Sequence, residues 1–312
     1  MICTLTINPA VDKLLFIPEL HRDNTNRIQR IEEVLGGKGT HVSVNLSILG
    51  CSNRAYGIGY GQTGKRIEQI LSDGGVDVAF LHFDEGESRT NYALIEDNHI
   101  CTLITEKGKT VPEKICRQLI DHMMDTMDDG DVLVLSGDAS NTEIPFIYNE
   151  VVDELIRRGK HIRVFLDTSS ENLIRGLERK PFLVKPNEDE LSQIMGKPVS
   201  TDGEVLEGIQ LISEKGIPCV AVSRGGKGSI VKYQGEIYKV HPLKVDVINT
   251  IGCGDAYLSG LVYGFEKEME FPEILKLATA ISAATAESDL TVGYDLNRAM
   301  ELKDQVQLEK ME

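Results

Sequence analysis

The sequence has few cysteines, and they are not spaced as metal-binding or disulfide-forming pairs. No C-x-x-C pair occurs; the six cysteines are Cys3, Cys51, Cys101, Cys116, Cys219 and Cys253. This scatter excludes a zinc ribbon and a disulfide framework. It favours isolated, buried thiols in a reducing compartment, so we expect a cytoplasmic protein.

Long apolar runs are also missing. No stretch of the 312 residues reaches the length needed to span a membrane. Residues 1–7 lack a basic start and are too short for the apolar region of a signal peptide. We therefore expect neither a membrane span nor a secretory signal.

Basic residues are outnumbered by acidic ones. The chain has 33 Lys and Arg against 49 Asp and Glu, a formal net charge of −16. A field of this sign repels nucleic acid and anionic membrane surfaces, so neither is an expected partner. Any anionic substrate must then be held by a local basic cluster.

Short apolar runs alternate with helical segments along most of the chain. The expected strands are residues 2–7, 55–58, 76–82, 131–136, 162–167 and 220–222. Nearly continuous apolar strands separated by helices favour a parallel sheet covered on both faces. The pattern predicts an α/β fold with a doubly wound, mostly parallel sheet flanked by helices. The acidic tail, residues 301–312, is expected to be a solvated helix end.

Two segments interrupt this alternation. Residues 14–34 and 90–105 have the pattern of hairpins, the second turning at residues 96–99. Strands inserted into a βα chain suggest a small accessory sheet that acts as a lid. We therefore divide the chain into an α/β core, residues 1–10, 35–88 and 107–312, and a β lid, residues 11–34 and 89–106.

A glycine-rich turn precedes the predicted helix 256–265. Gly252, Cys253 and Gly254 can aim backbone N–H groups at one point, where a helix N-terminus adds partial positive charge. Asp255 then stands where an incoming hydroxyl group could lose its proton to a carboxylate. The alternative is that Asp255 only caps the helix, and spacing alone favours that alternative.

A second glycine motif raises a different possibility. Residues 59–64 fit G-x-G-x-x-G after a strand, and Asp84 follows 20 residues on, which outlines a dinucleotide-binding oxidoreductase. The same segment resembles a P-loop, except that Arg66 stands where Ser or Thr must bind Mg²⁺. A non-catalytic sugar-binding protein is the third class to be considered.

Two further motifs lie far apart in the chain. The early one is Gly36-Gly37-Lys38-Gly39, followed by Asn45, and the late one comprises residues 249–260. Together these motifs resemble the two signatures of the PfkB, or ribokinase-like, carbohydrate kinases, and similar segments at 8–12, 185–191 and 223–229 extend the resemblance over nearly the whole chain. The resemblance implies phosphoryl transfer from ATP with Mg²⁺. It makes Asp255 the catalytic base, and Gly252, Cys253 and Gly254 the amide donors to the transferred group.

The resemblance also assigns a substrate end. Asp12 would bind sugar hydroxyls, Gly36 and Gly37 would let a polyol approach the backbone, and Lys38 would bring charge to it. Asn45 lies two helical turns after Lys38, so both are expected on one helix face. The alternatives are a turn-forming Asp12 and a solvated Lys38.

The pattern is most similar to the 1-phosphofructokinase and tagatose-6-phosphate kinase branch. Arg27 and Arg89 would grip a substrate phosphate, with Asn91 beside them, or else be two exposed lid arginines. Ala93 departs from the 1-phosphofructokinase pattern, where a Lys is usual. Asp138 departs as well, placing an acidic side chain near the expected sugar site. The exact hexose phosphate therefore stays open.

At the nucleotide end, Asn187 and Glu190 match an Asn-x-x-Glu motif tied to Mg²⁺ and phosphate placement, or equally a helix-capping pair. Lys185 would face the triphosphate, and residues 278–287 would wall the adenine. The loop beside the nucleotide would comprise Ser223, Gly225, Gly226 and Gly228, which is alternatively a hairpin turn. The resulting hypothesis is an ATP-dependent kinase converting fructose 1-phosphate to fructose 1,6-bisphosphate, or acting on tagatose 6-phosphate, with a possible homodimer through the lid.

Overall fold

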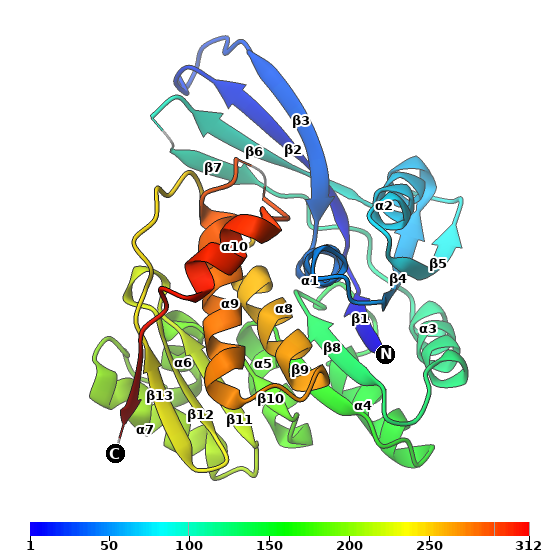
Figure 1. Ribbon diagram of the computed structural model, residues 1–312. Helices are drawn as coiled ribbons and strands as arrows, with labels where there is room; N and C mark the ends of the chain where they lie inside the picture. Colours follow the sequence, from blue (N-terminus) through cyan, green and yellow to red (C-terminus); the bar gives the residue numbers. More distant parts are fainter. Residues whose placement is uncertain (99, 290, 312) are drawn as a thin grey trace.

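The computed structural model describes residues 1–98, 100–289 and 291–311, and consists of a large α/β body with a small sheet projecting from it (Figure 1). Within these residues the body contains one ten-stranded sheet in the order β14-β13-β12-β11-β10-β9-β8-β1-β4-β5. The parallel strands are β1 (Ile2–Thr6), β4 (Asn53–Tyr60), β5 (Asp77–Phe83), β8 (Val132–Ser136), β9 (Arg163–Asp167), β10 (Leu183–Val184) and β11 (Cys219–Ser223). The doubly wound parallel sheet is confirmed.

The last strands of the body form an antiparallel extension. They are β12 (Ser229–Tyr233), β13 (Glu236–Val240) and β14 (Leu308–Met311). Residues 301–303 end a helix, as expected for the tail, but the expectation is wrong for residues 308–311, which pair with β13 as the edge strand. Met311 stands opposite Ile237 in that pair, which places an apolar side chain of the tail against the body.

Helices cover both faces of the sheet. One face carries α1 (Lys38–Ile48), α8 (Cys253–Glu266), α9 (Phe271–Ala286) and α10 (Leu296–Lys303), and the other carries α3 (Glu113–Thr126), α4 (Ile147–Arg157), α5 (Ser170–Gly176), α6 (Glu188–Met195) and α7 (Asp202–Ser213). Strand β8 shows why both faces are buried: Val132 and Val134 face the first helix layer, and Leu133 and Leu135 face the second. Helix α2 (Gly61–Asp73) packs at the β4–β5 end.

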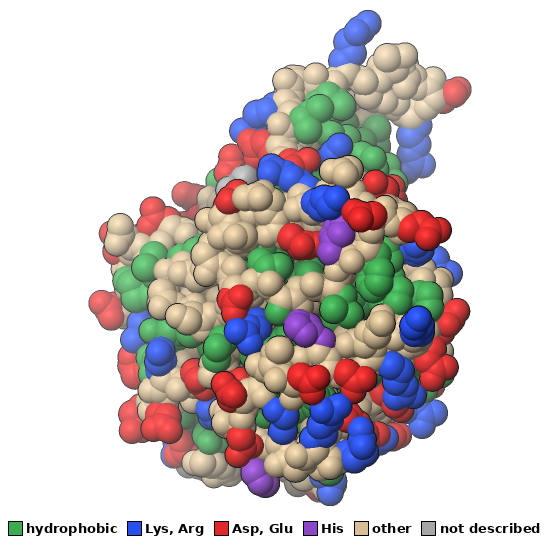
Figure 2. All heavy atoms as spheres, turned by 90° about the vertical axis from the view of Figure 1, so that its right-hand side faces the viewer, with side chains coloured by type: hydrophobic (Ala, Val, Ile, Leu, Met, Phe, Trp, Pro, Cys, Tyr) green, Lys and Arg blue, Asp and Glu red, His purple; other side chains and the backbone are tan. Residues whose placement is uncertain are grey.

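The small sheet has the order β3-β2-β6-β7, from β3 (Arg30–Gly36), β2 (Ala10–Ile17), β6 (Arg89–Glu96) and β7 (Cys101–Ile104). Both predicted hairpins are confirmed, and the parallel pairing of β2 with β6 joins them. The predicted turn at 96–99 includes His99, which lies outside the described residues. Figure 2 shows this sheet standing out from the body with hydrophobic side chains on its surface. The division into a core and a moving lid stays a prediction.

Among the described helices, none combines the length and the apolar character that crossing a bilayer requires.

Candidate active site

A cavity of about 440 Å³ opens at the carboxyl ends of the parallel strands, the edge where open α/β sheets bind ligands. It is lined by Thr6, Asn8, Gly37, Lys38, His41, Arg89, Gly137, Asp138, Asp167, Lys185, Asn187, Glu190, Ser223, Ile251, Gly252, Gly254 and Asp255. The cavity thus brings together residues from both glycine motifs, the small sheet and the segments after β9, β10 and β11.

The turn before α8 has the geometry of an anion-binding loop. Gly252 has a φ of +77°, and a Cβ added there would lie 2.0 Å from the carbonyl oxygen of Thr291, so only glycine fits. Cys253 and Gly254 form the first turn of α8, where amide groups have no carbonyl partner four residues earlier in the helix; the Cys253 amide makes one long bond, of 3.4 Å, to the carbonyl oxygen of Thr250. Lys185 Nζ would lie 3.6 Å from a Cβ at Gly254. An anion held here would meet backbone amides and an ammonium group together.

Asp255 lies on the first turn of α8, and its side chain is buried. The N-cap residue of this helix is Gly252, which has no side chain, so Asp255 is not the N-cap residue that the alternative required. Its Oδ2 atom lies 2.7 Å from Nδ1 of His41, and His41 Nε2 lies 2.8 Å from the carbonyl oxygen of Leu35. This contact joins the early glycine motif to the late one.

A buried carboxylate between two ammonium groups forms the floor of the site. Lys38 Nζ lies 3.2 Å from Oδ1 of Asp167, and Lys185 Nζ lies 3.1 Å from Oδ2. Burial raises the pKa of the Asp167 carboxyl, but the charges of Lys185 and Lys38 outweigh it and hold the pKa below its usual value. Asp167 in turn raises the pKa of Lys38. Two cations beside one anion supply the local basic cluster that an acidic protein needs to hold an anionic substrate.

The small sheet brings polar groups to the opposite side. Asp12 on β2 stands opposite Asn91 on β6, and Asp12 Oδ1 accepts a hydrogen bond of 2.7 Å from Asn91 Nδ2. A Cβ at Gly36 would lie 2.0 Å from the same oxygen, which explains the glycine there. Arg89 faces the cavity while its Nε atom donates to the carbonyl oxygen of Asn8 at 3.0 Å. Asp138 is exposed at the cavity rim and accepts hydrogen bonds from the amide and hydroxyl groups of Ser140.

A second cavity, of about 310 Å³, adjoins the first and shares Ser223 and Gly254 with it. Its walls are the loop containing Gly225, Gly226 and Gly228, which runs from β11 to β12, and the face of α9 with Thr279, Ser282, Ala283 and Ala286. The lining is largely apolar, with Leu243, Val245 and Val247 opposite. A largely apolar cavity that adjoins an anion-binding loop suits a base joined to phosphates.

Asn187 and Glu190 form the capping box that the sequence allowed. Asn187 Oδ1 accepts from the Glu190 amide at 2.8 Å, and Glu190 Oε2 accepts from the Asn187 amide at 2.9 Å. Both side chains also line the first cavity, and burial raises the pKa of Glu190. The structural role and a role at the phosphates are therefore compatible.

Comparison with known proteins agrees with this geometry. The family model described as "pfkB family carbohydrate kinase" matches residues 3–293. A 1-phosphofructokinase of Haemophilus influenzae is 28% identical over 100% of this chain and 99% of its own, and a tagatose-6-phosphate kinase of Staphylococcus epidermidis is 30% identical over 99% of both. Phosphofructokinase-2 of Escherichia coli, solved with substrates and products, superposes with a TM-score of 0.90 at 22% identity over 97% of this chain and 98% of its own, and shares the fold.

The chain belongs to the pfkB family of carbohydrate kinases.

Family membership makes the protein an ATP-dependent sugar kinase, and the structure shows why the dinucleotide motif at residues 59–64 has another purpose. A carboxylate already occupies its amides: Gln62 N donates to Glu87 Oε1 at 3.2 Å and Thr63 N to Glu87 Oε2 at 2.8 Å. Asp84, the expected ribose ligand, is paired with Lys65. The loop binds its own protein rather than a pyrophosphate.

Five of the predicted substrate contacts are not among the residues that line the first cavity of this pfkB kinase: Asp12, Gly36, Asn91, Asn45 and Arg27. The first three contact one another next to the lining residue Gly37. Asn45 is 1% exposed, and its backbone carbonyl accepts from the hydroxyl group of Tyr294. The same-face spacing with Lys38 is sound, but two helical turns carry Asn45 about 10 Å along α1 into the core. The prediction of a direct sugar contact for Asn45 is therefore wrong. Arg27 is exposed in the β2–β3 connection and does not line the cavity.

Sequence reasoning missed His41 and Asp167. Asp167 ends a buried apolar strand at the ligand-binding edge of the sheet, a signal that was available. His41 stands two residues after Gly39, the last residue of the first glycine motif. Nothing in the sequence indicates that its ring contacts Asp255, 214 residues further on.

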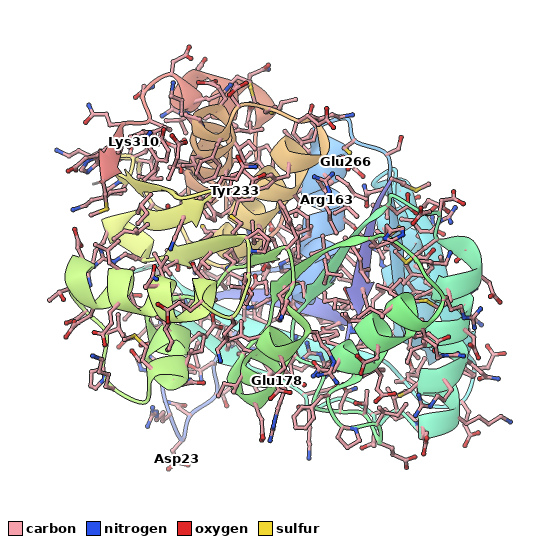
Figure 3. The ribbon with its side chains drawn as sticks, turned by 90° about the horizontal axis from the view of Figure 1, so that it is seen from below. Asp23, Arg163, Glu178, Tyr233, Glu266 and Lys310 are labelled. Carbon is pink, nitrogen blue, oxygen red and sulfur yellow. The ribbon has the colours of Figure 1, made fainter. Side chains whose placement is uncertain are left out.

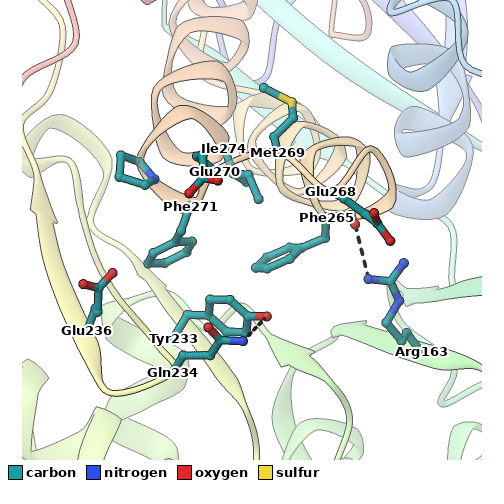
Figure 4. Close-up of a pocket in the computed structure, with 11 residues that line it drawn as sticks. Arg163, Tyr233, Gln234, Glu236, Phe265, Glu268, Met269, Glu270, Phe271 and Ile274 are labelled. Carbon is teal, nitrogen blue, oxygen red and sulfur yellow. Dashed lines mark hydrogen bonds between the residues drawn. The ribbon is translucent and has the colours of Figure 1, made fainter.

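Another cavity lies at the opposite end of the sheet, where Arg163 begins β9 (Figure 3). Arg163 donates to the carbonyl oxygen of Phe265 and pairs with Glu266 at 3.2 Å, and the rings of Tyr233, Phe265 and Phe271 form the walls (Figure 4). Because it is remote from the carboxyl edge and from both glycine motifs, this cavity is separate from the phosphoryl-transfer site.

Proposed function

We propose that the protein transfers the γ-phosphoryl group of ATP to a hydroxyl group of a hexose monophosphate, with fructose 1-phosphate as acceptor and fructose 1,6-bisphosphate as product. The observation that carries this proposal is the position of Asp255, a buried carboxylate at the N-terminus of α8, where the two cavities meet. Relatives named 1-phosphofructokinase at 28% and 29% identity support the choice of acceptor.

In this proposal Asp255 is the general base. Its carboxylate takes the proton of the acceptor hydroxyl group as the hydroxyl oxygen forms a bond to the γ-phosphorus, the bond from phosphorus to the β–γ bridging oxygen breaks, and ADP leaves. The amides of Gly252, Cys253 and Gly254, with Lys185 beside them, stabilise the charge on the transferred group. Catalysis is then mainly positioning and charge stabilisation.

The sugar phosphate lies between α1 and the small sheet. Asp12, fixed by Asn91, accepts hydrogen bonds from sugar hydroxyls, and Gly36 and Gly37 allow the sugar to approach the backbone. Lys38 and Arg89 attract the substrate phosphate, while the exposed Asp138 favours neutral hydroxyl groups at the rim.

The nucleotide occupies the apolar cavity beside α9, with its phosphates towards Lys185, Ser223 and Gly254. Mg²⁺ would neutralise the phosphates. Among the described residues no cluster of three or more His, Cys, Asp and Glu side chains could hold a metal ion. Mg²⁺ usually keeps several waters and needs only one or two carboxylates besides phosphates. Glu190 and Asn187 line the cavity and would hold the hydrated ion through its waters.

Tagatose 6-phosphate is the second candidate acceptor, because a relative named tagatose-6-phosphate kinase is 30% identical over 99% of both chains. Ala93 keeps this second candidate open, because it stands where a Lys is usual in 1-phosphofructokinases. Ala93 is 2% exposed and packs with Leu14 and Val34 inside the small sheet, so it supplies no charge to the substrate. A homodimer through the small sheet is also proposed, since Ile31, Leu103 and Ile104 are exposed there.

The test is ADP release with ATP and Mg²⁺ against a panel of fructose 1-phosphate, tagatose 6-phosphate, fructose 6-phosphate and unphosphorylated fructose. We expect the highest kcat/KM with fructose 1-phosphate. A higher value with tagatose 6-phosphate would reassign the acceptor within the same reaction. No stimulation by any hexose phosphate above the rate without acceptor would refute the proposal.

A further inference from the structure

The ring of His41 has a polar partner at each nitrogen. Nδ1 lies 2.7 Å from Oδ2 of Asp255 and Nε2 lies 2.8 Å from the carbonyl oxygen of Leu35, and the ring is buried. Rotating the ring by 180° would put carbon atoms at both contacts, so the orientation is fixed by its partners. His41 also lies directly under the anion-binding loop, since its Nδ1 would be 3.8 Å from a Cβ at Gly252.

The two contacts determine how many protons the pair holds. A carbonyl oxygen only accepts hydrogen bonds, so the bond to Leu35 needs a proton on Nε2. Nδ1 and a carboxylate oxygen at 2.7 Å also need a proton between them, because two acceptors at that distance repel. A neutral ring beside an ionised Asp255 cannot satisfy both contacts. The ring carries two protons, or Asp255 carries one.

We propose that His41 is a positioning residue held as an imidazolium ion, which fixes Oδ2 of Asp255 and leaves Oδ1 free to take the proton of the acceptor hydroxyl group. This inference rests on the proposed role of Asp255 as the base. In the transfer step His41 keeps both ring protons, and the hydroxyl proton goes to Oδ1 alone. The positive charge also offsets the negative charge that gathers when ATP and a sugar phosphate enter.

The charges around the ring favour the doubly protonated form. Asp255 faces it from α8, Asp12 from β2 and the Leu35 carbonyl from β3, while Lys38 is the cation on its own helix and is drawn towards Asp167. Burial lowers the pKa of His41, but the hydrogen bond and charge of Asp255, with the Leu35 carbonyl and Asp12, outweigh it and raise the pKa above its usual value.

Loss of one ring proton at high pH should therefore disturb the base, because the remaining proton cannot serve both contacts. A nitrogen lone pair would then face Oδ2 or the Leu35 carbonyl oxygen, and the ring would no longer hold the carboxylate in the position that serves the hydroxyl group. The rate should fall on the alkaline side, at a pH above the usual range of histidine. Asn is the informative replacement, because its amide group can take the place of Nδ1 as a donor to Asp255 but does not titrate.

The test combines pH profiles with a direct measurement of the ring. We expect His41→Asn to keep most of the kcat at neutral pH and to lose the alkaline fall, and His41→Leu to lose kcat by roughly 10-fold to 100-fold, as for a hydrogen bond to a charged group. The matched control is His82→Asn, which removes another histidine–carboxylate pair, 2.6 Å from Glu68 and remote from the site. Its profile should match the wild type.

Nitrogen-15 NMR of the histidine rings, with the His41 signals identified by their absence in His41→Asn, measures the protonation of the free protein. Two protonated ring nitrogens at neutral pH are expected, and one in Asp255→Asn. A neutral His41 ring in the wild type, or an unchanged alkaline fall in His41→Asn, would overturn the inference. Because the NMR experiment needs no turnover, failure of the proposed kinase reaction is recognised separately.

Discussion

Lys38 at the start of α1 and Asp167 at the end of β9 are joined by an ion pair of 3.2 Å that spans 129 residues of sequence. It ties the first glycine motif to the sheet edge where the cavity opens. Asp167 is 1% exposed and also pairs with Lys185, so this carboxylate fixes two of the cations in the site.

Replacing Asp167 with Asn should therefore destabilise the protein and impair the site. Removing one partner of a buried ion pair typically costs about 3–5 kcal/mol, and the free energy of unfolding from urea titration should fall by an amount of that order. The control is Asp121→Asn, which breaks an exposed pair with Arg158 and should change stability far less. Equal effects of the two substitutions would contradict the role given to Asp167.

The same carboxylate predicts the acid dependence of stability. Burial raises its pKa and the two lysines lower it, with a net value below the usual one. A group with a lowered folded-state pKa contributes stability above its unfolded value of about 3.9, and that stability is lost as the pH falls through the folded-state pKa. The free energy of unfolding of the wild type should fall below about pH 4 more steeply than that of Asp167→Asn. Parallel curves would mean that Asp167 is not ionised in the folded protein.

Asp255→Asn should keep the fold and lose most of its turnover. General-base assistance contributes roughly 10²–10⁴-fold, so kcat should fall by about that factor while the KM values for ATP and the sugar phosphate change little. Steady-state kinetics with fructose 1-phosphate measures this, and unfolding curves check that the variant is folded. Wild-type kcat in a folded variant would remove Asp255 from the mechanism.

The two candidate phosphate-binding arginines can be separated. Arg89 lines the cavity and Arg27 does not, so Arg89→Ala should raise the KM for the sugar phosphate by a factor equivalent to about 1.5–3 kcal/mol and leave the KM for ATP nearly unchanged. Arg27→Ala should raise the same KM only if closure of the small sheet brings Arg27 to the phosphate, and should leave it nearly unchanged if the sheet stays open. Unphosphorylated fructose is the control, since an equal loss on fructose would show that Arg89 does not act through the phosphate.

Features that depend on local sequence patterns could be predicted from the sequence. Apolar runs such as 132–135 predicted buried parallel strands, and the interruption at 14–34 predicted a separate hairpin. The sequence was insufficient where partners lie far apart in the chain. The end of an apolar strand marks Asp167 as a residue of the ligand-binding edge, but its pairing with Lys38 and Lys185 has no local signal. The contact of His41 with Asp255 has none either, because both arrangements depend on how β9, α1 and α8 converge. The prediction for Asn45 was wrong because spacing shows which face of a helix a residue occupies, but not whether that part of the face lies in the cavity or in the core.

We expect the small sheet to move. Strand pairing puts Asp12 and Asn91 opposite each other, and two positions further along the same face come Leu14 and Ala93, with Leu103 opposite Ala93. That face carries proposed substrate contacts at one end, and Leu103 is 55% exposed. A sheet that is anchored to the body at one end and bears exposed apolar side chains tends to close over a ligand or pair with another copy.

We therefore expect the sheet to move towards the body when sugar phosphate binds, excluding water from the transfer site. Hydrogen exchange should slow in β2, β3, β6 and β7 on adding fructose 1-phosphate, while β12 and β13 at the far side of the body serve as the internal control. Unchanged exchange in the small sheet, with bound ligand shown by calorimetry, would mean a rigid extension of the fold. Sedimentation of the free protein tests whether the same surface forms a homodimer instead. A monomer at micromolar concentration would exclude the dimer and leave closure over the ligand as the role of Leu103.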